Sequence, residues 1–182
     1  FFLLLTLINP FTWIRAGKKF QNKRQSRLRT NTNEGLLSLV TGNLNRSNKL
    51  LTKGLKDNDS SVLNYLGLVS VAVEKGETDK VIEILDLALK NYPLESVSIE
   101  RCRAKFLFRE REFQGCASIL QSLQDQIPKE PWLLKFLKKT YEELRDWEAL
   151  ESLEPALRKH KIFPVGELDR LENKIVLEKL RL

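Results

Sequence analysis

Residues 62–93, VLNYLGLVSVAVEKGETDKVIEILDLALKNYP, predict two amphipathic helices joined by a short turn. Apolar side chains at helical spacing mark one face of each helix for burial: Tyr65, Leu68 and Ala72 in the first, Val81, Leu85 and Ala88 in the second. Gly76 marks the turn. Pro93 ends the second helix, because proline has no amide hydrogen and disfavours helical geometry in the residue before it. The stretch therefore predicts a helical hairpin.

This hairpin resembles a tetratricopeptide (TPR) repeat, whose 34-residue signature combines bulky, small and turn positions with a closing proline. Nine residues, counted from Val62, match that signature: Tyr65, Leu68, Val69, Ala72, Gly76, Val81, Leu85, Ala88 and Pro93. A poorer copy precedes it, since Gly42 stands 34 residues before Gly76. We therefore expect an all-α, TPR-like helical-hairpin solenoid from residue 31 to residue 182.

The solenoid divides into repeating units with a partial unit at its end. We expect them at about 31–58, 62–93, 96–128, 131–160 and 165–182. In the third unit the second helix repeats the pattern after 35 residues, so one extra residue is expected in the turn at 109–112. Pro155 and Lys138 should loosen or kink the fourth unit. The last helix is expected to have no partner within the chain.

Charge is concentrated at the start of the chain. The net charge is +7, from 31 Lys and Arg against 24 Asp and Glu. Residues 1–30 hold seven of the basic residues and no acid, so the rest of the chain is neutral. Because the basic run follows an apolar run at residues 1–14, it indicates a membrane edge.

The apolar run FFLLLTLINPFTWI spans about 21 Å as a helix, less than the roughly 30 Å of a bilayer core. We interpret residues 1–14 as the end of a transmembrane helix and 15–30 as a basic juxtamembrane segment. The expected membrane-interface residues are Trp13, Arg15, Lys18 and Lys19. A docked hydrophobic helix and a nucleic-acid arm are the alternatives. The second is disfavoured, because the basic run contains one aromatic residue, Phe20, where a stacking surface would require several, and no nucleic-acid partner is expected.

The whole pattern resembles the N-terminal region of HemY-like TPR proteins. Three stretches carry this resemblance: NEGLLSLVTGNLNRSNKLL, NYLGLVSVAVEKGETDKV and TYEELRDWEALESLEPAL. It implies a bacterial inner-membrane protein with its TPR region on the cytoplasmic side and a role late in protohaem biosynthesis. It also implies haem-biosynthesis enzymes as partners, and it carries over no catalytic residue. A general envelope-associated TPR adaptor unrelated to haem is the alternative.

The residues themselves predict no enzyme. Phosphate loops, nucleophile motifs and clusters of His, Cys and carboxylates are missing from the sequence. No cofactor is expected, although haem or porphyrin binding stays open. His160 is the one histidine, and a helix-end cap is favoured over an axial haem ligand. Cys102 and Cys116 are expected to be core residues rather than reactive thiols.

Binding is therefore the expected activity, through the first helix of each repeat. TPR geometry turns one face of these helices into a protein-binding groove, predicted here to contain Leu63, Leu66, Val73, Trp132, Lys135 and Lys139. Phasing of the third unit leaves two alternatives for its inward face, either Leu107 with Phe108 or Arg101 with Lys105. The lysines of the groove would orient an acidic segment of a partner.

Overall fold

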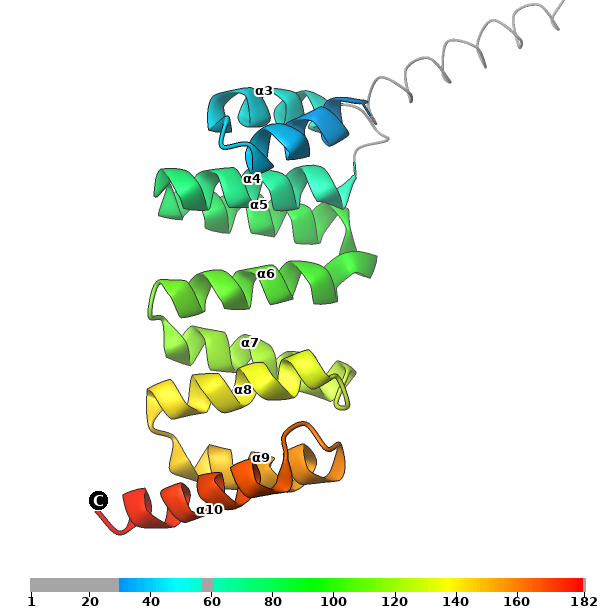
Figure 1. Cartoon of the computed structure of the whole chain (residues 1–182). Helices are drawn as coiled ribbons and strands as arrows, with labels where there is room; N and C mark the ends of the chain where they lie inside the picture. Colours follow the sequence, from blue (N-terminus) through cyan, green and yellow to red (C-terminus); the bar gives the residue numbers. More distant parts are fainter. Residues whose placement is uncertain (1–29, 57–60, 182) are drawn as a thin grey trace, which may run out of the picture. The chain divides into compact units, whose positions relative to one another are not determined.

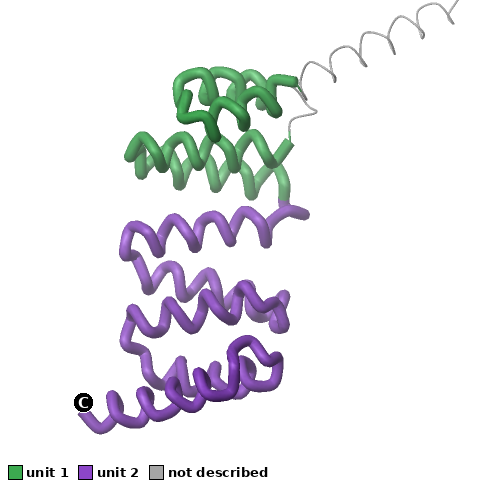
Figure 2. The backbone as a smooth tube through the Cα atoms, in the orientation of Figure 1, with its two compact units in different colours: residues 1–92 green, residues 93–182 purple. Residues whose placement is uncertain are grey.

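The computed structural model describes residues 30–56 and 61–181, in two compact units that divide between residues 92 and 93 (Figure 2). Each unit is built from helical hairpins (Figure 1), and no strand occurs in the described ranges. The predicted all-α, TPR-like fold is confirmed.

Unit 1 is held together by close approach of helix backbones. Its described helical segments are residues 30–40, α3 (Leu44–Leu55), α4 (Val62–Lys75) and α5 (Thr78–Asn91). The side chain of Leu51 is fully buried, and a Cβ atom added to Gly35 or Gly67 would come within 2.8 or 2.7 Å of it. Both glycines therefore leave room for Leu51 between the first helical segment and α4.

A buried polar contact also joins the first helical segment to α4. The Thr32 hydroxyl donates a hydrogen bond of 2.9 Å to the side-chain oxygen of Asn64, and both residues are buried. A Cβ atom on Gly54 of α3 would lie only 2.7 Å from that same oxygen. The small residue at Gly54 is thus required by a buried amide group, and not by an apolar neighbour.

Unit 2 repeats the hairpin pattern. Its elements are a short 3₁₀ turn (Pro93–Glu95), α6 (Ser96–Arg109), α7 (Phe113–Gln126), α8 (Pro131–Leu144), α9 (Trp147–Lys159) and α10 (Val165–Lys179). One apolar cluster runs through the unit. Its fully buried members include Leu120, Leu134, Leu137 and Leu150.

The positions of the helices confirm the predicted change in repeat length. Helices α4 and α6 begin 34 residues apart, at 62 and 96, whereas α5 and α7 begin 35 apart, at 78 and 113. The extra residue lies in the turn at 110–112, which is one residue longer than the turn at 76–77. A longer turn leaves both buried faces in phase.

Five of the described turns between consecutive helices contain one residue with positive φ. In unit 1 these residues are Gly42 and Gly76, at 77° and 71°. In unit 2 they are Arg111, Arg145 and Lys161, at 63°, 55° and 51°. Left-handed geometry ends a helix most easily at glycine. The sequence pattern therefore marked the turns of unit 1 more clearly than those of unit 2.

One expectation for the end of the chain is wrong. Helix α10 does have a partner: Leu168, Leu171 and Ile175 are buried in the cluster of unit 2, where α10 packs on α9. The looser packing expected of the fourth unit is found, since α9 packs on α8 less extensively than α7 packs on α6. Pro155 lies on the exposed side of α9, which continues to Lys159. An exposed proline leaves the buried face intact, and the carbonyl that loses its partner can be solvated.

A matched pair of glycine substitutions tests this packing. We expect Gly54→Ala to lower the free energy of unfolding by about 1–3 kcal/mol, because the new methyl group displaces the hydrogen-bonded Asn64 amide. Gly115→Ala in α7 is the control. Its Cβ would lie 3.4 Å from Leu107, so higher helix propensity should stabilise the chain by up to about 1 kcal/mol. Urea denaturation measures both, and destabilisation by Gly115→Ala of the same size would contradict the argument.

The predicted transmembrane end and membrane-interface residues lie outside the described ranges. This applies to residues 1–14 and to Trp13, Arg15, Lys18 and Lys19. Among the helices that are described, none combines the length and the apolar character needed to cross a bilayer.

Candidate functional site

The predicted groove residues are divided between the two units. Leu63, Leu66 and Val73 lie on one face of α4 in unit 1, with Leu63 exposed and the other two half-buried. Trp132, Lys135 and Lys139 lie on α8 in unit 2. Each set is therefore a candidate surface of its own unit.

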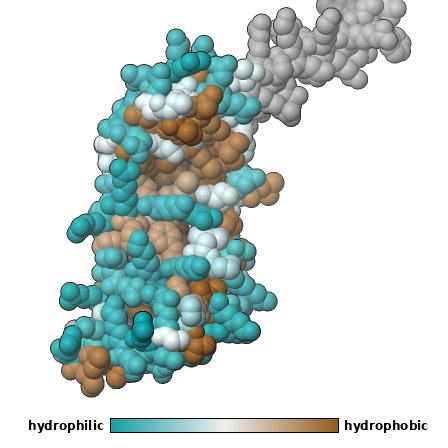
Figure 3. Space-filling model, in the orientation of Figure 1, coloured by the Kyte–Doolittle hydropathy of each residue, from teal (hydrophilic) through white to brown (hydrophobic). Residues whose placement is uncertain are grey.

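The surface of unit 1 is apolar. Leu63 of α4 is 48% exposed, and Leu37 and Val40 in the first helical segment are 63% and 84% exposed. Apolar side chains gather on the face of unit 1 shown in Figure 3. Such exposure of large aliphatic side chains indicates a contact surface.

The surface of unit 2 contains a pocket of about 300 Å³ between α6 and α8, which we call the α6–α8 pocket. Three basic and three aromatic side chains line it: Arg101, Lys105, Phe108, Trp132, Phe136 and Lys139. Two of the predicted groove residues, Trp132 and Lys139, are therefore brought together here, beside three residues from α6.

Contacts between cations and rings order this pocket. The Arg101 guanidinium lies 4.3 Å from the centre of the Trp132 ring, and the Lys139 ammonium lies 4.5 Å from the centre of the Phe108 ring. Phe108 also contacts Phe136, with ring centres 5.4 Å apart. Two of the three basic groups thus rest on an aromatic face, which fixes their positions without neutralising their charge.

The residues that line the pocket show which face of α6 is the inward face of the third unit. Arg101, Lys105 and Phe108 share one face of α6, at a spacing of four and three residues. Leu107 does not line the pocket; like Phe108 it packs against the core cluster, and a Cβ on Gly115 would lie 3.4 Å from it. The inward face therefore combines one member of the apolar alternative with both members of the basic one. Helical spacing from Arg101 could have identified this combination.

Lys135 lies elsewhere on α8. Its ammonium group is 5.9 Å from the centre of the Phe163 ring, and that of Lys138 is 5.4 Å from the same ring. Phe163 belongs to the connection between α9 and α10, which the sequence pattern did not relate to α8. Lys138 also pairs with Glu142 at 2.9 Å. Its charge is thus compensated at a position where most repeats need a small residue.

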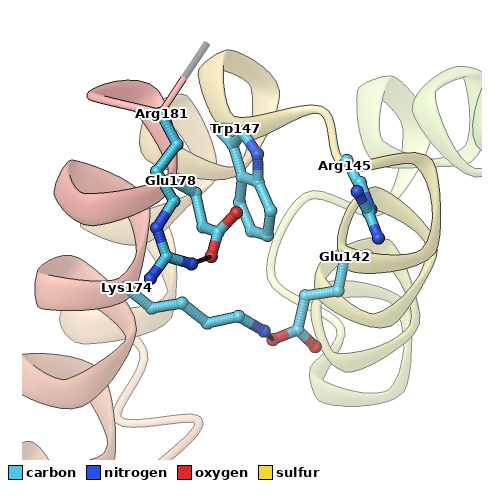
Figure 4. Close-up of a pocket in the computed structure, with 6 residues that line it drawn as sticks. All are labelled: Glu142, Arg145, Trp147, Lys174, Glu178 and Arg181. Atoms are coloured by element: carbon cyan, nitrogen blue, oxygen red, sulfur yellow. Dashed lines mark hydrogen bonds and ion pairs between the residues drawn. The ribbon is translucent and has the colours of Figure 1, made fainter.

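A second pocket of about 550 Å³ lies between α8, α9 and α10, and its lining residues are labelled in Figure 4. Lys174 pairs with Glu142 at 3.5 Å, and Arg181 pairs with Glu178 at 2.8 Å. Lys174 also lies 5.4 Å from the centre of the Trp147 ring. Both acids of this pocket are therefore neutralised by its own basic residues.

The sulfur and imidazole groups show no arrangement for chemistry. Cys116 is buried beside the Thr140 hydroxyl at 3.6 Å, and burial raises the pKa of the Cys116 thiol. Cys102 is half-buried, and burial raises its pKa as well, although Lys105 and Arg101 oppose the shift. His160 occupies the C-cap position of α9. No three metal-ligating side chains come together in the described ranges.

Comparison with known proteins agrees with this picture. No protein-family model matches the chain. It is 22% identical to Protein HemY of Escherichia coli over 140 residues, which cover 77% of this chain and 35% of HemY. Protein HemY of Shigella flexneri matches equally. The aligned region therefore spans about a third of the length of these curated relatives.

Solved structures share the fold. A structure of MamA AMB-1 superimposes with a TM-score of 0.62 at 15% identity, covering 86% of this chain and 83% of that one. A structure of MamA MSR-1 gives a TM-score of 0.59 at 14% identity, covering 87% and 86%. At this identity the likeness concerns the fold alone. The resemblance to HemY-like proteins is thus confirmed in sequence, on a helical-hairpin fold of the kind found in MamA.

Proposed function

We propose that this chain is the protein-binding part of a membrane-anchored TPR scaffold that supports a late step of protohaem biosynthesis. The α6–α8 pocket is the observation that carries the binding role. It presents three aromatic rings and three basic groups on the helix face that a TPR hairpin offers to partners. A surface that contacts only water is not expected to cluster aromatic rings and basic groups in this way.

The link to haem rests on the similarity to HemY. Because the chain spans only about a third of those relatives, the similarity supports the role without specifying a partner. We propose enzymes of the haem pathway as the proteins that are bound. No catalytic activity is proposed for the chain.

The placement in the cell follows from the charge pattern. We place residues 1–14 at the end of a transmembrane helix in a bacterial inner membrane, with the hairpins on the cytoplasmic side, because seven basic residues follow the apolar run. A reporter fused after Leu182 of the full-length protein should then be active only in the cytoplasm. Activity in the periplasm, or release of the protein from membranes by high salt alone, would contradict this placement.

Affinity purification of the full-length protein from solubilised membranes tests the haem role. We expect enzymes of haem synthesis among the retained proteins, at levels that fall when Trp132 and Lys139 are both replaced. The same bait with Lys159→Gln, which changes an exposed lysine of α9, is the matched control. Retention of other envelope proteins without any haem enzyme would favour the general adaptor instead.

A further inference from the structure

The α6–α8 pocket carries positive charge that no acidic group of its own offsets. In the described part of the chain, no ion pair joins Arg101, Lys105 or Lys139 to a carboxylate. The second pocket of the same unit differs, since Glu142 and Glu178 pair with its basic residues. The excess is larger in the α6–α8 pocket, where three basic residues stand against no acid, than in the second pocket, where three stand against two, and it favours an anionic ligand.

One donor of this pocket lacks an acceptor. The Nε atom of Arg101 is buried, and no hydrogen-bond partner for it occurs among the described residues. The guanidinium is held over the Trp132 ring, so its N–H groups point outward in its own plane. A buried donor without a partner costs free energy, so the Arg101 guanidinium keeps hydrogen-bonding capacity that the described residues do not use.

The aromatic lining of the α6–α8 pocket favours a ligand that carries an apolar group as well as negative charge. Phe108, Trp132 and Phe136 provide apolar surface around a volume of about 300 Å³, which is more than a single carboxylate would fill. The chain contains an internal example of such a contact, since the Phe163 ring lies near the ammonium groups of Lys135 and Lys138 on α8. A ligand that suits the pocket therefore carries a large apolar group next to negative charges.

The spacing of the basic groups fits an extended peptide. Arg101 and Lys105 are one turn apart on α6, a rise of about 6 Å. Alternate side chains of an extended chain point to the same side and repeat at about 6.6 Å. Two acidic residues separated by one residue can thus meet Arg101 and Lys105 together. An apolar side chain two residues further would lie near Phe108.

We propose that the α6–α8 pocket binds an extended acidic peptide segment that inserts an aromatic side chain among Phe108, Trp132 and Phe136. Carboxylates on the same side of the segment pair with Arg101, Lys105 and Lys139. This inference rests on the proposed scaffold function and defines the chemistry of the partner. Because recognition needs both parts, neither an acidic segment without an aromatic residue nor an apolar one without acids should bind well.

A synthetic peptide tests the inference directly. The probe is a fluorescein-labelled Glu-Ser-Glu-Ser-Phe-Ser-Glu peptide with an amidated C-terminus, and fluorescence anisotropy measures its binding to the 182-residue chain. We expect saturable binding that weakens with salt. Replacing Phe by Ala in the peptide should weaken binding about tenfold. Replacing every Glu by Gln should abolish it.

Variants of the chain assign the site. Arg101→Gln, Lys105→Gln and Lys139→Gln should each weaken binding about three- to tenfold, because each removes one charge from the pocket. Lys159→Gln removes one exposed charge from α9 outside the pocket and should leave the affinity unchanged. Equal losses for Lys159→Gln and the pocket variants would show non-specific attraction and overturn the proposal. Binding of free naphthoate without binding of the peptide would overturn it too, by showing a small-molecule site.

Failure here can be distinguished from failure of the scaffold function. If the peptide does not bind while haem-pathway enzymes still co-purify with the full-length protein, the pocket proposal is wrong and the scaffold role stands. If the peptide binds in a pocket-dependent way and no haem enzyme co-purifies, the pocket proposal stands and the haem assignment is wrong.

Discussion

Leu85→Ala and Leu120→Ala are each expected to lower the free energy of unfolding by about 2–5 kcal/mol. Both side chains are fully buried, at equivalent positions of α5 and α7, one in each unit. Truncation removes apolar contacts and leaves a cavity that neighbouring helices fill only in part. In units this small, such a loss is a large fraction of the total stability.

Leu87 provides the matched control for this prediction. It lies two residues after Leu85 on the same helix but is 52% exposed. Leu87→Ala should change the free energy of unfolding by less than about 0.5 kcal/mol. Thermal and urea unfolding followed by circular dichroism measure all three variants. Unchanged unfolding of both core variants would contradict the assignment of these positions to the core.

Trp132→Ala is expected to weaken partner binding by at least about 1–2 kcal/mol, roughly 5- to 30-fold in affinity. The indole is half-buried in the α6–α8 pocket, where it supports the Arg101 guanidinium. Its removal takes away apolar contact area and also frees a charged group that the ring had positioned. Binding of the acidic aromatic peptide, measured by anisotropy, reports the change.

Unfolding of Trp132→Ala must be measured in parallel, because the ring also packs against the core cluster of unit 2. Trp132→Phe keeps an aromatic face under Arg101 and should retain more affinity than the alanine variant. If Trp132→Ala binds like the parent and only its melting temperature falls, the residue is part of the core and the groove assignment is wrong.

Local patterns in the sequence were sufficient to predict the hairpins. Tyr65, Leu68 and Ala72 are buried on one face of α4, and the turn at 110–112 contains the predicted extra residue. These features depend on helical periodicity and on turn residues, which act over a few positions of the chain. The same patterns marked Trp132 and Lys139 as groove residues. They could not show which neighbours would meet them.

The sequence by itself determined the class of fold, the repeat length and the basic start of the chain. Tertiary structure decided which side chains share a pocket, because helix α7 separates Arg101 from Trp132 in the chain and the two meet only when α6 and α8 come together. It also decided that Lys135 lies near Phe163, a residue of a connection with no periodic pattern. Periodicity specifies the face of a helix on which a residue lies. Packing specifies what that face contacts, since contact depends on residues far apart in the chain.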